Sequence, residues 1–145
     1  MTVPGGNVRG KVRDRSKVWL SFSISNFKCD AGEISRGLQL KPSRVLLRGE
    51  LYPNSRAIQN INLWNYRGRG RGINVQRQVD LILEDLRYFS RIRKIIRGSR
   101  VRLTAVIEIS IGDQIPVISV NADSMLILGK MGVDFEVDYY LIGGE

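Results

Sequence analysis

One long amphipathic stretch, from Asn74 to Arg97, constrains the fold of this chain more than any other segment. At 100° per residue its apolar side chains fall on one side, as in a helix that lies on a sheet. Those side chains are Val75, Val79, Ile82, Leu83, Leu86, Phe89, Ile92 and Ile96. Asn74 can cap the start, and Gly98 suits a left-handed residue after the end. We therefore predict a single helix over 74–97.

The exposed side of this helix becomes purely basic toward its end. Seven cations occur without an acid between them: Arg87, Arg91, Arg93, Lys94, Arg97, Arg100 and Arg102. Two interpretations of this run are open. In the structural one, the cations are present because the helix dipole favours positive charge near a helix C-terminus. In the functional one, they bind phosphate, because planar guanidinium groups fit phosphate oxygens. Arg93 falls in the middle of the apolar side, so either the helix bends near Ile92 or its last turns project beyond the sheet.

Other segments show the patterns of strands and shorter helices. Strict alternation of apolar and polar residues predicts strands over 18–25, 101–109 and 133–141, and weaker patterns predict strands over 45–47 and 58–66. Asp30 and Glu33 have the spacing of a capping box, with Asp30 capping the N–H of Glu33, which starts a short helix that ends near Leu40. Asn121 or Ser119 can cap a third helix through Met131, closed by Gly132. An extended apolar piece, 115–120, contains Pro116 and is expected either at an edge of the sheet or as a lead-in to the next element.

The order of these elements predicts an α+β fold. It contains one mostly antiparallel sheet with its helices on one face. The first six elements follow the ferredoxin-like order, extended by a helix and a strand. Residues 1–17 are polar, glycine-containing and basic, and are expected to be a flexible arm. Residues 18–145 are expected to form a single domain.

The residue types present exclude much of the usual chemistry of enzymes. The chain has no histidine and one cysteine, Cys29. It therefore lacks the usual general base, the usual zinc ligands and any intramolecular disulfide. No phosphate-binding glycine fingerprint is present, and no apolar run approaches the roughly 18 residues of a membrane span. We expect no catalysis, no cofactor, no bound metal and no membrane span, and, without a signal-peptide pattern, a cytoplasmic location.

The charge of +9 is unevenly distributed along the chain. After residue 102, Lys130 is the only cation, against seven acidic side chains. Three of these, Asp134, Glu136 and Asp138, alternate along the last predicted strand. Carboxylates spread along a strand do not converge on one metal ion. We expect them to pair with Arg100 and Arg102 or to lie beside a serine-lined strand, with a metal or a basic protein partner as less favoured alternatives.

Two features outside the long helix are candidates for binding. Residues 67–72 read Arg-Gly three times and are expected to form a loop. The loop is either a plain flexible surface loop or a segment that contacts single-stranded RNA through stacked guanidinium groups. Trp19 should lie on the solvent-exposed face of the first strand beside Ser21 and Ser23. It is either a partner anchor or covered by a segment such as the N-terminal arm.

Two blocks of the sequence resemble a known family. The first is Asp30-x-x-Glu33-Ile34-Ser35-x-x-Leu38-x-Leu40-x-Pro42-Ser43-Arg44, followed by Arg48-Gly49-Glu50 and, later, Trp64. The second closes the chain, from Leu126-x-Leu128-Gly129-x-Met131-Gly132-Val133 through Asp134-Phe135-Glu136-Val137-Asp138-Tyr139-Tyr140. Together they are similar to the bacterial domain-of-unknown-function family 4279, a resemblance that spans 18–142. The Arg-Gly segment is a departure from it. The resemblance implies a small α+β domain with no assigned catalytic residues, and some relatives occur in toxin-neutralising or similar interaction contexts.

The combined observations predict a non-catalytic protein-interaction module. Charge segregation and a candidate aromatic anchor favour binding. The features that would favour catalysis, which are a nucleophile–base pair, a metal cluster or a phosphate loop, are not found in the sequence. The expected partner-binding residues are Trp19, Arg69, Arg87, Arg91, Arg93, Lys94, Arg97 and Arg102. The alternative is a nucleic-acid-binding protein that uses the basic arm, the Arg-Gly loop and the arginine-rich helix end.

Overall fold

The computed structural model describes residues 16–51 and 55–143. The basic arm expected at 1–17 therefore lies almost entirely outside the described residues. Lys17 is within them, and it is the first residue of a strand rather than part of an arm.

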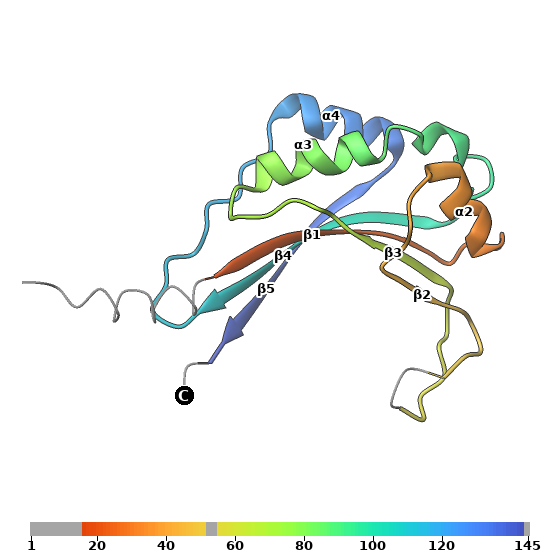
Figure 1. Ribbon diagram of the computed structural model, residues 1–145, viewed down its shortest axis with the longest axis horizontal. Coiled ribbons are helices and arrows are strands. Elements are labelled where there is room, and N and C mark those ends of the chain that lie inside the picture. The colour runs from red at the N-terminus through yellow and green to blue at the C-terminus, as the bar shows by residue number, and fades with distance from the viewer. Residues whose placement is uncertain (1–15, 52–54, 144–145) are drawn as a thin grey trace, which may run out of the picture.

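The described chain forms one five-stranded sheet with helices on one face (Figure 1). In chain order the elements are β1 (Lys17–Ser25), α2 (Ala31–Leu38), β2 (Arg44–Leu46), β3 (Leu63–Arg67), α3 (Val75–Asp85), the 3₁₀ turn η1 (Phe89–Arg91), β4 (Arg100–Ser110), α4 (Ala122–Met131) and β5 (Asp134–Ile142). The strands lie in the order β2-β3-β1-β4-β5. The β4–β5 pair is parallel and the other pairs are antiparallel. The predicted α+β class is confirmed, while the ferredoxin-like order stays a prediction.

The helices begin where side-chain oxygens can cap them. Asn74 Oδ1 accepts a hydrogen bond from the N–H of Arg77, and Asn121 Oδ1 accepts one from the N–H of Ser124. Asp30 caps α2, although its carboxylate accepts from the N–H of Gly32 rather than from that of Glu33 as expected. Gly132 and Gly98 have positive φ angles, 75° and 84°, where the sequence predicts left-handed residues.

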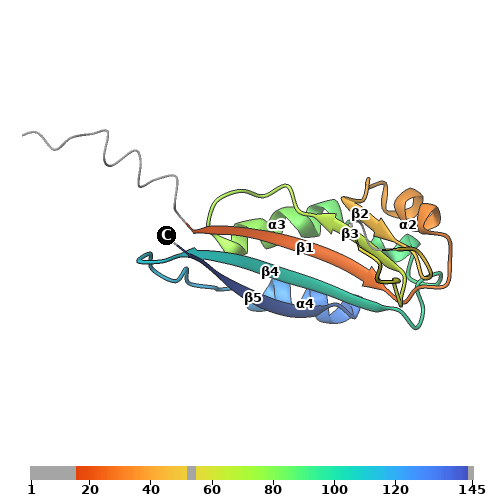
Figure 2. The ribbon, with the colours of Figure 1, turned by 90° about the horizontal axis from the view of Figure 1, so that it is seen from below.

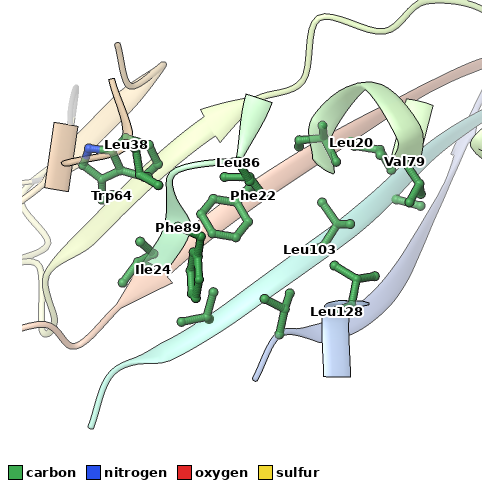
Figure 3. Packing of buried hydrophobic residues seen from close by; sticks show 14 of the residues in the cluster. Leu20, Phe22, Ile24, Leu38, Trp64, Val79, Leu86, Phe89, Leu103 and Leu128 are labelled. Atoms are coloured by element: carbon green, nitrogen blue, oxygen red, sulfur yellow. The ribbon is translucent and has the colours of Figure 1, made fainter. Parts of the chain in front are cut away.

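The core lies between the helices and the face of the sheet that they cover (Figure 3). At its centre, the ring of Phe22 on β1 meets Trp64 of β3 and Phe89 of η1, each edge to face with 6.3 Å between ring centroids. Trp64 is fully buried, and its indole N–H donates to the hydroxyl of Ser35 on α2 over 3.0 Å. This bond satisfies the one polar group of the largest core side chain and ties α2 to the sheet.

The predicted helix over 74–97 is too long. Helix α3 ends at Asp85, and η1 and a series of turns follow up to Gly98. In this region the N–H of Phe89 donates to Leu86 O, and the N–H of Ile92 donates to Phe89 O, both three residues back. A spacing of three keeps Leu86, Phe89 and Ile92 on one side in a 3₁₀ geometry just as it does in an α-helix. All three are buried as predicted, but Arg93 turns outward.

The weaker strand predictions shift in position. β2 covers 44–46 rather than 45–47, and β3 covers 63–67 rather than 58–66. Segment 115–120 forms no strand. β5 covers 134–142 rather than 133–141. Tyr139 and Leu141 on its expected apolar face are 53% and 77% exposed, because α4 covers only the first part of the strand. The face of the sheet opposite the helices has no helix over it among the described residues (Figure 2).

Candidate interaction surface

Five cations gather in the turn region between α3 and β4. They are Arg87, Arg91, Arg93, Lys94 and Arg97, here called the basic cluster, and all five are exposed. Within the described part of the chain, none of them forms an ion pair with an acidic side chain. Like charges this close repel one another, so the basic cluster creates a positive potential that an anionic partner would neutralise.

The ring of Tyr88 contacts two members of the basic cluster. The guanidinium carbon of Arg87 is 4.8 Å from the centroid of the Tyr88 ring, and that of Arg91 is 4.0 Å from it. A hydrogen bond from Arg87, together with the charges of Arg87 and Arg91, lowers the pKa of the Tyr88 hydroxyl. The half-buried ring therefore helps to orient both guanidinium groups, and that of Arg87 also donates to Glu84 O over 3.0 Å.

An apolar cleft of about 340 Å³ opens beside the basic cluster. It is lined by Leu83 and Leu86 of α3, Phe89 and Ser90 of η1, Ile127 and Met131 of α4, and by Arg87 and Arg93. Arg93 bridges the two sides of the cleft, because its guanidinium donates to the backbone oxygen of Lys130 at the end of α4. The cleft thus has apolar walls and a cationic rim, and Ile127 in its wall is 47% exposed.

The structure separates the eight residues predicted to bind a partner. Five of them form the basic cluster. Arg102 lies on the open face of the sheet, where Glu136 accepts from it and from Arg100 at 3.4 Å each. Arg100 also pairs with Asp134 at 3.9 Å, so the predicted pairing between these strands is confirmed for two of the three carboxylates. These cations are neutralised within the fold.

Trp19 lies on the open face, as predicted, and is half-buried. The guanidinium carbon of Arg67 sits over its ring at 4.4 Å from the centroid. A side chain of the adjacent Arg-Gly segment therefore covers the tryptophan. The alternative that the N-terminal arm covers Trp19 concerns residues outside those described.

The Arg-Gly segment packs against the fold instead of standing free as a plain flexible loop. The N–H of Gly68 donates to Leu20 O over 2.9 Å, and Arg69 pairs with Asp85 at 3.0 Å and with Glu84 at 3.3 Å. A Cβ on Gly70 would lie 2.8 Å from Cγ of Gln78 on α3. A glycine is therefore required at position 70 by the close approach between this segment and the helix.

The pKa values of two other side chains are raised by burial and by neighbouring groups, in line with a role in the fold. Burial, followed by a hydrogen bond to Asp85, raises the pKa of Tyr66 to about 12. Burial and then Glu33 raise the pKa of Cys29, which keeps this side chain a thiol rather than a nucleophilic thiolate near neutral pH. Among the described residues, no three His, Cys, Asp or Glu side chains are grouped so that they could hold a metal ion. In that same part of the chain no helix has the length and apolar character to cross a membrane.

Comparison with known proteins assigns the chain to a family. The model of the family described as "Domain of unknown function (DUF4279)" matches residues 16–142. The chain belongs to this family. Both sequence blocks that resemble DUF4279 lie inside the match, so the predicted relationship is confirmed. No curated protein and no solved structure matches the chain.

For this DUF4279 member, sequence reasoning identified the cations of the surface but missed the apolar half. Tyr88 carried a local signal, because arginines stand one residue before it and three residues after it. Ile127 and Met131 carried none, since an apolar residue in a helix is expected to face the core. Their place beside the basic cluster depends on how α4 lies against α3.

Proposed function

We propose that this DUF4279 domain is a protein-interaction module that binds an acidic protein surface through the basic cluster and the apolar cleft. The observation that carries the proposal is the combination of five cations lacking ion pairs within the described chain and an apolar cleft that two of them line. A toxin-neutralising role, suggested by the family resemblance, is one form that such an interaction takes.

The two parts of the surface would contribute differently to binding. An apolar side chain of the partner would fill the cleft between Leu86 and Ile127 and lose its contact with water, which is the usual source of affinity at the centre of an interface. Carboxylates around that side chain would meet Arg91, Lys94 and Arg97. Charges at an interface rim mainly set specificity and the rate of association.

The cleft favours a protein over a nucleic acid at this surface. A nucleic acid would offer phosphates to the cations but only small apolar groups, such as the thymine methyl, for the walls formed by Leu83, Ile127 and Met131. A single-stranded base would stack on an exposed aromatic ring, and both faces of Tyr88 cannot be free when two guanidinium groups lie against the ring.

The test is affinity capture from nuclease-treated extract of the source organism, followed by titration of the purified partner. One variant, Arg91→Glu with Lys94→Glu, reverses charge in the basic cluster. A second, Ile127→Ser, changes the cleft wall at an exposed position. The matched control reverses two exposed cations elsewhere, Arg44→Glu with Arg48→Glu. We expect a stoichiometric acidic protein whose affinity falls at least about tenfold in the first two variants and less than about twofold in the control.

Three results would overturn the proposal. The captured protein could bind the Arg91/Lys94 variant as tightly as the wild type, or Ile127→Ser could leave its affinity unchanged. Alternatively, binding that disappears after nuclease treatment, and returns with added RNA or DNA, would identify a nucleic-acid-binding protein instead.

A further inference from the structure

A second cleft, of about 450 Å³, lies at the opposite end of α3 from the basic cluster. It is bounded by the first residues of β1 and by the Arg-Gly segment, which runs beside β1 on its way to α3 (Figure 2). β3 pairs with β1 only from Ser21 onward, so Lys17 to Leu20 have no neighbouring strand on this side. The cleft occupies the space that such a strand would fill.

The lining of this cleft is basic and contains no acidic residue among those described. Lys17, Arg67, Arg69 and Arg71 contribute to it. Arg69 is neutralised by Asp85 and Glu84. Lys17, Arg67 and Arg71 are exposed, and no ion pair to any of them occurs in the described chain. Three positive charges therefore surround a polar cleft and form no ion pair within the described chain.

The cleft is held in shape by bonds on both sides of it. Gln78 is buried, and its side-chain amide donates to Val18 O over 2.9 Å and to Gly72 O over 2.8 Å, which joins β1 to the end of the Arg-Gly segment. Gly68 is bonded to Leu20, and Gly70 packs against Gln78 with no room for a side chain. The backbone that carries Arg67 and Arg71 is thus anchored before any ligand arrives, which lowers the entropic cost of binding.

Arg67 is oriented further by its neighbours. Its backbone N–H donates to the hydroxyl of Ser43 over 2.8 Å, and its guanidinium lies on the ring of Trp19. Stacking leaves the edge of a guanidinium free to donate hydrogen bonds, and that edge matches the spacing of phosphate oxygens.

We propose that this cleft binds a phosphate group of an organic phosphate or of a nucleic-acid strand, held by Lys17, Arg67 and Arg71. This site is separate from the basic cluster and does not rest on the function proposed above. Its volume falls within the range of small-ligand sites, about 300–1,000 Å³.

The experiment measures binding to the full chain at low ionic strength with two probes, inorganic pyrophosphate and a labelled single-stranded RNA of about eight nucleotides. Calorimetry and the fluorescence of Trp19 report on binding, with Trp64 serving as a buried reference. The test variant is Arg67→Ala with Arg71→Ala. The matched control, Arg48→Ala with Arg56→Ala, removes the same amount of charge from exposed positions that belong neither to this cleft nor to the basic cluster. Thermal unfolding checks that both variants fold.

For whichever probe the wild type binds, we expect the affinity of the Arg67/Arg71 variant to be about tenfold or more lower than that of the wild type. The affinity of the control should be less than about threefold lower. RNA that binds much more tightly than pyrophosphate would identify a strand as the ligand, and similar affinities would identify an isolated phosphate group. The proposal is overturned if neither probe binds, if the test variant binds like the wild type, or if the control loses as much as the test variant, since binding then reflects net charge alone.

Discussion

The carboxylate of Asp85 holds the guanidinium of Arg69 in place. Arg69 Nε donates to Asp85 Oδ1 over 3.0 Å and to Oδ2 over 3.3 Å, and the hydroxyl of Tyr66 donates to Oδ2 over 2.7 Å. Asp85 is 8% exposed and is the last residue of α3. One buried carboxylate therefore joins the end of the helix to β3 and to the Arg-Gly segment.

Asp85→Asn should destabilise the fold by about 1.5–3 kcal/mol, because an amide carries no charge and cannot accept all of the bonds that the carboxylate accepts. Urea unfolding followed by circular dichroism measures the change. Asp80→Asn is the matched control, since Asp80 is exposed on the same helix and its side chain bonds only to Gln76 within the described part of the chain. The control should change stability by less than about 0.5 kcal/mol. Equal effects of the two variants would show that the Asp85 contacts contribute nothing.

Tyr66 should make the protein less stable in strong alkali. The pKa of its hydroxyl rises from 10.0 to about 12 on folding. Below pH 10 the hydroxyl is protonated in both states, and its contribution to stability is fully present. Between pH 10 and 12 the unfolded chain loses this proton while the folded chain keeps it, so stability falls. The loss should stay below about 2.7 kcal/mol, the value of two pKa units, because solvent screens this partly exposed group.

Tyr66→Phe provides the comparison, since it lacks the titrating hydroxyl. The free energy of unfolding of the wild type should fall more steeply than that of Tyr66→Phe between pH 10 and 12, measured by urea unfolding at each pH. Parallel curves would mean that the environment of Tyr66 does not favour its protonated form.

Two glycines in helices should respond to alanine in opposite ways. A Cβ on Gly37 of α2 would collide with Cγ2 of Ile92, which packs beneath it, whereas a Cβ on Gly129 of α4 would meet nothing within 4 Å. Gly37→Ala should cost about 1–3 kcal/mol through overpacking. Gly129→Ala should stabilise the protein by about 0.5–1 kcal/mol, because alanine favours a helix. Thermal unfolding distinguishes the two, and stabilisation by both would mean that α2 is not tightly packed against the turn after α3.

The ion pairs between β4 and β5 should contribute little to stability. Glu136 accepts from Arg100 and Arg102, but its side chain is 32% exposed and that of Arg100 is 59% exposed. Glu136→Gln should therefore cost less than about 1 kcal/mol, and high salt should reduce the difference further. Unfolding at low and high salt provides the measurement. A loss well above this value, independent of salt, would mean that the pairs are effectively buried.

Some elements were predictable because their pattern is local. The strands β1, β4 and β5 follow from alternation alone, since successive side chains of a strand point to opposite faces. The start of α3 and both ends of α4 follow from Asn74, Asn121 and Gly132, whose side chains or backbone freedom act within a few residues. These predictions did not require any knowledge of the rest of the fold.

The length of α3 could not be predicted in this way. The apolar spacing of Leu86, Phe89 and Ile92 is the same in an α-helix and in a 3₁₀ turn, so periodicity does not distinguish them. In the structure, the helix ends at the residue whose carboxylate binds Tyr66 and Arg69, which are distant in the sequence. Arg93 falls on the apolar side of a helical wheel only because the wheel continues the α-helix past Asp85, where α3 ends.

The long amphipathic stretch by itself determined that a helix would cover a sheet and that a run of cations would follow it. Only the tertiary structure decided which cations are neutralised. Arg69 meets Asp85, Arg102 meets Glu136, and Arg91 meets no acid among the described residues. Ion pairing depends on the distance between charged groups in space, and that distance is set by how strands and helices pack. The same packing places Ile127 and Met131 beside Arg87 and Arg93, where a basic run becomes a surface with an apolar cleft.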